Sequence, residues 1–345
     1  MKINQQERRS VYDMTTSQGL TVSIMTLGAG IEKIILKNQK EQEHHLALGF
    51  PDISNYKSSD SYAGATLGPN AGRISGTNPP CQLHGGINNL SFYNWQIESL
   101  SYDYASARIC LSAYQPDGMD GYPGNRLYHV TYTLEDTNWL SIDYRATTDA
   151  DTYINMSNHT YWNLSGDFSL SALKQKLQIF SNNVCINTEH HLPFDIIPVA
   201  DTAFDFRELQ PIDALIRTAA DPVSRNQLQI GNGYNNAFLL NKQDKFRKLR
   251  SVKHEVSLKN ACILKDVKSG CTLKMLTDAP ALVLYSGGYL PEGISLHGGA
   301  LSSRSCAIAL EAQDIPDVMH LLPSSCCLTT PLRPFHRTIR FHISA

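Results

Sequence analysis

A histidine in the middle of the chain stands among side chains suited to hydrogen bonding and to aromatic contact. His159 lies in the segment Ser157–Leu164, which reads Ser-Asn-His-Thr-Tyr-Trp-Asn-Leu, so that Tyr161 and Trp162 follow it closely. A histidine is a suitable general acid because its unperturbed pKa, about 6.5, lies near working pH. The mixture favours a groove that binds a polar molecule with a flat apolar face, such as a sugar. A core histidine bonded to backbone is the alternative interpretation.

A glutamate near the C-terminus is the candidate partner. Glu311 follows the apolar run Ala307–Leu310, which is typical of a buried strand. A carboxylate at the end of such a strand is partly desolvated, and desolvation raises its basicity. The alternative is a solvated carboxylate. Asp314 and Asp317, which follow, are expected to form turns.

An arginine and a second histidine stand on two closely spaced glycine-rich segments. Arg73 belongs to the run 68–74, Gly-Pro-Asn-Ala-Gly-Arg-Ile, and His84 to the run 83–86, Leu-His-Gly-Gly. On loops, both side chains could donate hydrogen bonds to sugar oxygens. The alternative is a surface salt bridge and a turn histidine. Leu-His-Gly-Gly recurs at 296–299 without an arginine loop before it, so His297 is left out of the predicted site.

Composition excludes several kinds of partner. The chain of 345 residues has 30 basic and 32 acidic residues, a formal charge of −2 and no long run of one sign. Binding of nucleic acid or of an anionic membrane through a basic patch is therefore not expected. No stretch of about 18 apolar residues and no leader segment is visible, which predicts a cytoplasmic protein without a membrane span.

The spacing of cysteines and histidines predicts no metal site. None of the eight cysteines forms a C-x-x-C pair, which argues against structural zinc and predicts free thiols. The pairs His44-His45 and His190-His191 are adjacent in sequence. Neighbouring residues on a strand point to opposite faces, so neither pair chelates easily.

Apolar residues alternate with polar ones along much of the chain. Alternation of this kind indicates strands with one buried face, and it occurs within 107–111, 128–134, 140–144 and 339–343. Helical periodicity is scarce, with one short turn of helix predicted within 207–217. Many short strands without a linker predict one all-β domain over 1–345, a large antiparallel sandwich or barrel.

Six segments together resemble the aldose 1-epimerase (galactose mutarotase) family, in the family's order. They are the loop around Arg73, then Leu-His-Gly-Gly at 83–86, Asp-Gly at 117–118 with Gly-Tyr-Pro-Gly at 121–124, Asn-His-Thr-Tyr-Trp-Asn-Leu at 158–164, Phe-Asp-Phe-Arg at 204–207, and Glu-Ala-Gln with Pro-Asp at 311–317. The similarity extends from about Gly28 to the C-terminus.

The resemblance implies a β-supersandwich and an isomerase that interconverts the α and β anomers of a free hexose, galactose or glucose. It implies Glu311 as the base that takes the anomeric hydroxyl proton and His159 as the acid that protonates the ring oxygen, facing each other across one hexose-sized gap. The implied substrate contacts come from His84, Arg73, Asn235, Trp162 and Tyr161, with one of the two aromatics stacking on the sugar. The reaction needs no cofactor and no metal, and a monomer or homodimer is expected.

The chain departs from the family's pattern in three places. Asn235, in Gly-Tyr-Asn-Asn at 233–236, replaces an aspartate that binds sugar hydroxyls. The loop before Arg73 lacks the usual first arginine and asparagine, and the stretch 74–83 is shorter than the usual hairpin, which predicts a lower cleft wall. These departures motivate two alternatives: a sugar-binding sensor without turnover, and an epimerase for a phosphorylated hexose that uses Arg207 or Arg304. A glycosidase pairing Glu311 with Asp205 or Asp314 is a further alternative.

Overall fold

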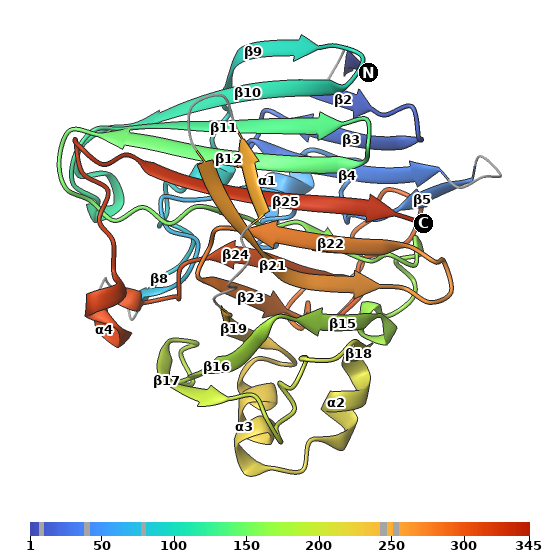
Figure 1. Ribbon diagram of the computed structural model, residues 1–345, viewed down its shortest axis with the longest axis vertical. Helices are drawn as coiled ribbons and strands as arrows, with labels where there is room; N and C mark the ends of the chain where they lie inside the picture. The colour runs from blue at the N-terminus through green and yellow to red at the C-terminus, as the bar shows by residue number, and fades with distance from the viewer. Residues whose placement is uncertain (7–9, 38–41, 77–80, 242–246, 251–254) are drawn as a thin grey trace.

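The computed structural model describes residues 1–6, 10–37, 42–76, 81–241, 247–250 and 255–345. Antiparallel β-sheets dominate these residues (Figure 1), which confirms the predicted all-β class. The helices are few and short: α1 (Ser54–Ser58), α2 (Ile212–Thr218), α3 (Pro222–Ile230) and α4 (Val318–Leu321), with 3-10 turns η1 (Leu90–Phe92), η2 (Met119–Gly121), η3 (Ala172–Lys174) and η4 (Pro323–Ser325). No helix in this part of the chain is long and apolar enough to cross a membrane.

Three sheets build the body of the fold. The first is a meander of β1 (Lys2–Gln6), β2 (Val11–Thr15), β3 (Leu20–Met25), β4 (Gly30–Lys37) and β5 (Glu43–His45). The second and largest has the order β18 (Gln210–Pro211), β15 (Lys176–Ile179), β21 (Glu255–Lys265), β22 (Thr272–Thr277), β25 (Phe335–Ser344), β12 (Trp139–Thr148), β11 (Arg126–Glu135), β10 (Ser106–Gln115), β9 (Gln96–Tyr102), with β20 (Arg247–Arg250) beside β21.

The third sheet has six strands, and short pairs lie beside it. Its order is β14 (Tyr161–Trp162), β24 (Ile308–Gln313), β23 (Ala281–Tyr285), β19 (Asn235–Leu240), β16 (Ser181–Asn187), β17 (Pro193–Pro198). Two two-stranded sheets pair β13 (Ser157–Asn158) with β6 (Thr66–Leu67), and β7 (Ile74–Ser75) with β8 (Cys81–Gln82). Residues 77–80, the middle of the shortened stretch, lie outside the described residues, so the height of the cleft wall stays a prediction.

The main hydrophobic core lies where the faces of the three sheets meet. It is filled by the alternating residues that the sequence identified, such as Tyr128, Val130 and Tyr132 on β11 and Ile142 on β12, all fully buried. Because alternate residues of a strand share a face, each strand has one set of side chains in this core and the other set outside it. The strands predicted within 107–111, 128–134, 140–144 and 339–343 are confirmed as parts of β10, β11, β12 and β25.

The helical turn predicted within 207–217 is confirmed. Helix α2 (Ile212–Thr218) occupies the second half of that stretch, directly after β18, which pairs with β15. Helix α3 was not predicted from the sequence. Its start carries a clear signal: Asp221 accepts a hydrogen bond from the Ser224 backbone N–H at 2.7 Å, and Pro222 occupies the first turn.

Candidate active site

One face of the six-stranded sheet carries the candidate base. On β24, Leu310 and Ala312 point into the main core, whereas Glu311 and Gln313 point to the opposite face. Strand register places Val283 of β23 beside Glu311. Val283 and its neighbour Ala237 on β19 have short side chains, which leave room above the sheet for a cavity.

That cavity has a volume of about 350 Å³, within the usual range for small-ligand sites. Six of the seven predicted site residues line it: Arg73, His84, His159, Tyr161, Asn235 and Glu311. They come from segments as distant in sequence as the loop before β7, which holds Arg73, and β24, which holds Glu311. The fold therefore gathers onto one surface residues that the sequence separates widely.

Trp162 is the exception, and strand geometry explains why. In β14, Tyr161 pairs with Ala309 and Trp162 pairs with Ile308. Successive residues of a strand point to opposite faces, so only one of the two rings can reach the cavity. Tyr161 lines it, while Trp162 is fully buried in the main core with its ring centroid 5.1 Å from that of Phe341. The structure thus corrects the expectation of a sugar contact from Trp162.

The candidate acid and base lie next to each other rather than across a gap. His159 Nε2 is 3.7 Å from Glu311 Oε1. They are this close because the segment that holds His159 runs beside β24, where the Ser157 hydroxyl donates to the Ala312 carbonyl at 2.9 Å. A separation of this size suits two oxygens bonded to one carbon, as in the anomeric centre of a sugar.

Burial controls the protonation of this pair. Glu311 is 4% exposed, and burial raises the pKa of its carboxyl from 4.5 to about 8. His159 is equally buried, and burial lowers its pKa from 6.5 to about 4. At neutral pH both groups therefore rest in their uncharged forms. Nδ1 of His159 has no hydrogen-bond partner among the described residues.

His84 is fixed as a neutral hydrogen-bonding group. Its Nδ1 lies 2.6 Å from the Ala71 carbonyl oxygen, which can only accept, so Nδ1 carries the proton and Nε2 is left as an acceptor. Burial is the main cause that holds the pKa of His84 well below its ordinary value, and the nearby His159 and Arg73 add to it. The ring stands edge-on to His159, with centroids 5.5 Å apart.

The turn that presents His84 depends on glycine. His84 has a left-handed backbone (φ 54°), and Gly85 after it has φ 95°. A Cβ at Gly85 would come within 2.4 Å of the Gly68 carbonyl oxygen, so no larger residue fits there without moving the loop.

Arg73 and Asn235 supply the remaining predicted polar groups. The Arg73 guanidinium makes no ion pair with any described residue, so it is available to a ligand. Asn235 faces the cavity from the first position of β19. Its backbone carbonyl oxygen accepts a hydrogen bond from Asn187 Nδ2 at 2.8 Å. The amide of Asn235 can both donate and accept toward a sugar hydroxyl.

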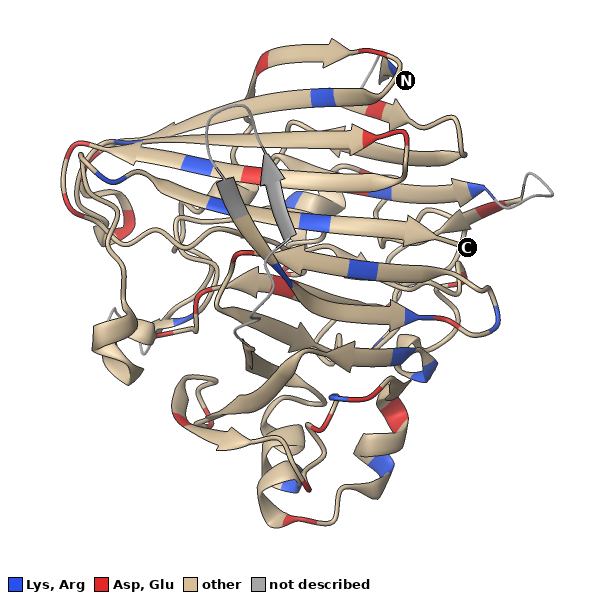
Figure 2. Ribbon diagram, viewed as in Figure 1, with Lys and Arg blue, Asp and Glu red and all other residues tan. Residues whose placement is uncertain are grey.

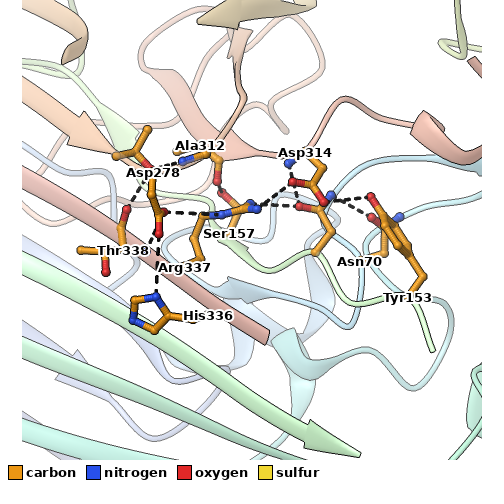
Figure 3. A network of polar contacts seen from close by, with 12 residues as sticks. Asn70, Tyr153, Ser157, Asp278, Ala312, Asp314, His336, Arg337 and Thr338 are labelled. Atoms are coloured by element: carbon orange, nitrogen blue, oxygen red, sulfur yellow. Dashed lines mark hydrogen bonds and ion pairs between the residues drawn. The ribbon is translucent and has the colours of Figure 1, made fainter. Parts of the chain in front are cut away.

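A network of polar side chains around Arg337 connects segments on which site residues lie (Figure 3). Arg337 of β25, 6% exposed, donates to Asp314 Oδ1 at 2.7 Å and to Asn155 Oδ1 at 3.1 Å. Asn155 Nδ2 in turn donates to Asn70 Oδ1 at 3.0 Å, and Asn70 Nδ2 donates to the Gly72 carbonyl at 2.6 Å. One guanidinium therefore ties the end of β24 to the loop that carries Arg73.

Sequence reasoning missed several residues of the cavity, namely Tyr62, Asn187, His191, Tyr285, Tyr289 and Gln313. Gln313 had a usable signal, because it stands two residues after Glu311 on a strand and must share its face. His191 had none, since a left-handed residue (φ 59°) at a hairpin turn aims it at the cavity. Elsewhere, His297 Nε2 lies 3.5 Å from Glu32 Oε1, and neither residue lines the cavity. No group of three or more potential metal ligands occurs within the described ranges.

Comparison with known proteins identifies relatives along nearly the whole chain. The family model described as aldose 1-epimerase matches residues 10–331. The aldose 1-epimerase of Escherichia coli K12 is 30% identical over 321 residues, covering 88% of this chain and 86% of that protein. The galactose mutarotase of Sus scrofa is 27% identical over 350 residues, covering 95% and 92%. The solved structure of galactose 1-epimerase from Lactobacillus acidophilus NCFM superposes with a TM-score of 0.80 at 26% identity, covering 99% of this chain and 98% of that one.

Proposed function

We propose that this chain, which belongs to the aldose 1-epimerase family, interconverts the α and β anomers of a free aldose such as galactose or glucose. The observation that carries the proposal is the pairing of Glu311 and His159, 3.7 Å apart and open to one cavity. Anomer interconversion requires proton transfer at two oxygens of a single carbon. A carboxyl and an imidazole in contact with the same anomeric centre can perform both transfers.

The reaction runs through an open-chain sugar. Glu311, as carboxylate, takes the proton of the anomeric hydroxyl while His159, as imidazolium, gives a proton to the ring oxygen. The bond between C1 and the ring oxygen breaks, and C1 becomes a carbonyl carbon. After rotation about C1–C2, the hydroxyl formed from the ring oxygen attacks the other face of the carbonyl. His159 then acts as the base and Glu311 as the acid. Each such general acid or base typically contributes about 10²–10⁴-fold. The sugar is neither oxidised nor reduced overall, so the proposed reaction uses no cofactor.

The other cavity residues are proposed to hold the sugar. The free Nε2 of His84 is proposed to accept a hydrogen bond from a sugar hydroxyl, not to donate one as expected from the sequence, and the Arg73 guanidinium to donate to a sugar oxygen. Asn235 is proposed to contact hydroxyls where relatives carry an acid, and the Tyr161 ring to lie against the apolar face. A cytoplasmic location, a monomer or homodimer, and the absence of nucleic-acid partners are proposed from the sequence alone.

The structure disfavours two alternatives. Arg207 is bound by Asp205 at 2.6 Å, Arg304 lies 3.3 Å from Glu292, and neither arginine lines the cavity, so neither is placed to bind a sugar phosphate. Asp314 is paired with Arg337 at 2.7 Å and Asp205 with Arg207 at 2.6 Å, and neither aspartate lines the cavity, so neither is placed to act with Glu311 as in a glycosidase.

Saturation-transfer NMR between the anomeric protons of galactose and of glucose tests the proposal. We expect exchange faster than in buffer for the wild-type chain and exchange at the buffer rate for Glu311→Gln. Gln178→Leu, a change on β15 away from the cavity, serves as the control with wild-type exchange. If the wild type binds a sugar by calorimetry yet accelerates exchange of no aldose, the chain is a sensor and the proposal fails.

A further inference from the structure

We propose that Gln313 is a positioning residue that holds the Glu311 carboxylate in its working orientation, and that Gly72 keeps the Gln313 amide in place. This role rests on the proposed function of Glu311. Nothing in the family resemblance assigns a role to either residue. Both line the cavity, and they come from different parts of the fold, β24 and the loop before β7.

The first support is the contact between the two side chains. Gln313 Nε2 donates to Glu311 Oε2 at 3.1 Å, and Gln313 is only 1% exposed. In its ionised working form Glu311 has no proton to donate, so the amide must turn its nitrogen toward the carboxylate. The two oxygens of Glu311 thereby differ: Oε2 is held by the amide, while Oε1 faces His159. Without the amide, rotation of the carboxyl group would exchange these two positions.

The second support is the oxygen at the other end of the Gln313 amide. It is buried and has no hydrogen-bond partner among the described residues. A buried acceptor without a partner is unfavourable, and a fold tolerates one where another contact fixes the orientation. When Glu311 is ionised, reversing the amide would bring its oxygen against the carboxylate oxygen, so the contact with this working form explains why Oε1 stays unpaired.

Gly72 explains how the amide is confined. A Cβ at Gly72 would lie 2.9 Å from Gln313 Oε1 and 2.9 Å from Pro316 Cβ, too close for either without movement. Glycine therefore allows the loop to close over the amide oxygen. The loop itself is anchored, since Asn70 Nδ2 donates to the Gly72 carbonyl and the Asp317 N–H donates to the Arg73 carbonyl at 2.9 Å. A larger residue at position 72 would push Gln313 away from Glu311.

The test is a direct titration of the Glu311 carboxyl, which does not depend on turnover. The carboxyl carbon is observed by NMR in ¹³C-glutamate-labelled protein and is assigned by its loss in Glu311→Gln. Hydrogen bonding to the charged form favours ionisation, so Gln313→Leu should raise the ionisation midpoint of Glu311 by about one to two pH units. Gly72→Ala keeps the amide but displaces it, and should move the midpoint in the same direction. Gln178→Leu should leave it unchanged.

Activity provides the second readout. We expect kcat for anomer exchange to fall about tenfold in Gln313→Leu, with KM changed less, because the carboxylate loses its orientation while the sugar contacts remain. If Gln313→Leu does not fold, Gly72→Ala carries the test. A folded Gln313→Leu or Gly72→Ala with the wild-type midpoint overturns the proposal. If the midpoint rises but the wild type catalyses no exchange, the positioning role stands and the proposed function fails.

Discussion

Replacing the candidate base with its neutral isostere should stabilise the protein at alkaline pH. Glu311 is almost completely buried, and its pKa is about 8 in the folded chain against 4.5 for the free side chain. Between these values the native state keeps a proton that the unfolded state has released. Stability therefore falls as pH rises through this range, because the unfolded state binds fewer protons than the native state. Glu311→Gln has no proton to lose and no such dependence.

The size of the effect follows from the two pKa values. A span of about 3.5 pH units at about 1.4 kcal/mol per unit gives about 5 kcal/mol. Glu311→Gln and the wild type should therefore have similar free energies of unfolding near pH 4.5. The variant should then become more stable by about 1.4 kcal/mol per pH unit and reach its full advantage above pH 8. His159 also titrates with folding, but with a native pKa of about 4 it is neutral in both folded proteins between pH 5 and 8, so its contribution is the same in both.

Urea denaturation monitored by circular dichroism at pH 5, 6, 7 and 8 measures this difference. The gain in stability should coincide with loss of anomer exchange, since the variant lacks the proposed base. A difference that stays flat between pH 5 and 8 would refute the reasoning. It would mean that the native pair is already ionised, as carboxylate and imidazolium, across this range.

Three further predictions concern the acid, the pH profile and the network behind the site. His159→Gln should lower kcat for anomer exchange by about 10²–10⁴-fold while circular dichroism stays that of the wild type. The wild-type kcat/KM should be highest between about pH 4 and pH 8, because burial gives His159 and Glu311 these pKa values. A pH–rate profile in which kcat/KM changes with a midpoint near pH 6.5 would contradict this. Arg337→Met should cost about 1–3 kcal/mol in urea denaturation, because the Asp314 carboxylate, 18% exposed, loses its charged partner at 2.7 Å and keeps, among the described residues, only the Tyr153 hydroxyl at 3.3 Å.

Local pattern was sufficient for much of the fold. Alternating residues predicted β11 and β12 because each strand exposes one face to the core, and that constraint is written in consecutive side chains. The same rule, applied to Tyr161 and Trp162, would have shown that only one of the two rings reaches the cavity. Helix α3 was missed for a different reason. It is short and mostly polar, so few apolar side chains mark a buried face, and only the capping pair Asp221-Pro222 marks its start.

The geometry of the site was beyond local pattern. His159 and Glu311 are about 150 residues apart in sequence, and their contact depends on which strands pair, β14 with β24, and in which register. Long-range pairing of this kind is not encoded in the periodicity of either strand. Motifs pointed to the residues, but they placed the pair across a gap, whereas the sheet brings the two side chains to 3.7 Å.

The short distance between acid and base also explains how so buried a site can turn over. The resting pair, a protonated carboxyl and a neutral imidazole, holds one proton, and so does the working pair of carboxylate and imidazolium. Because the two atoms are 3.7 Å apart, beyond a hydrogen bond, that proton passes from Glu311 to His159 through a sugar oxygen placed between them, without exchange with bulk solvent. Because ring closure reverses the roles used in ring opening, the pair regains its proton count after every turnover. Burial can therefore raise the basicity of Glu311 at a cost in stability, since the reaction never needs water to reset the pair.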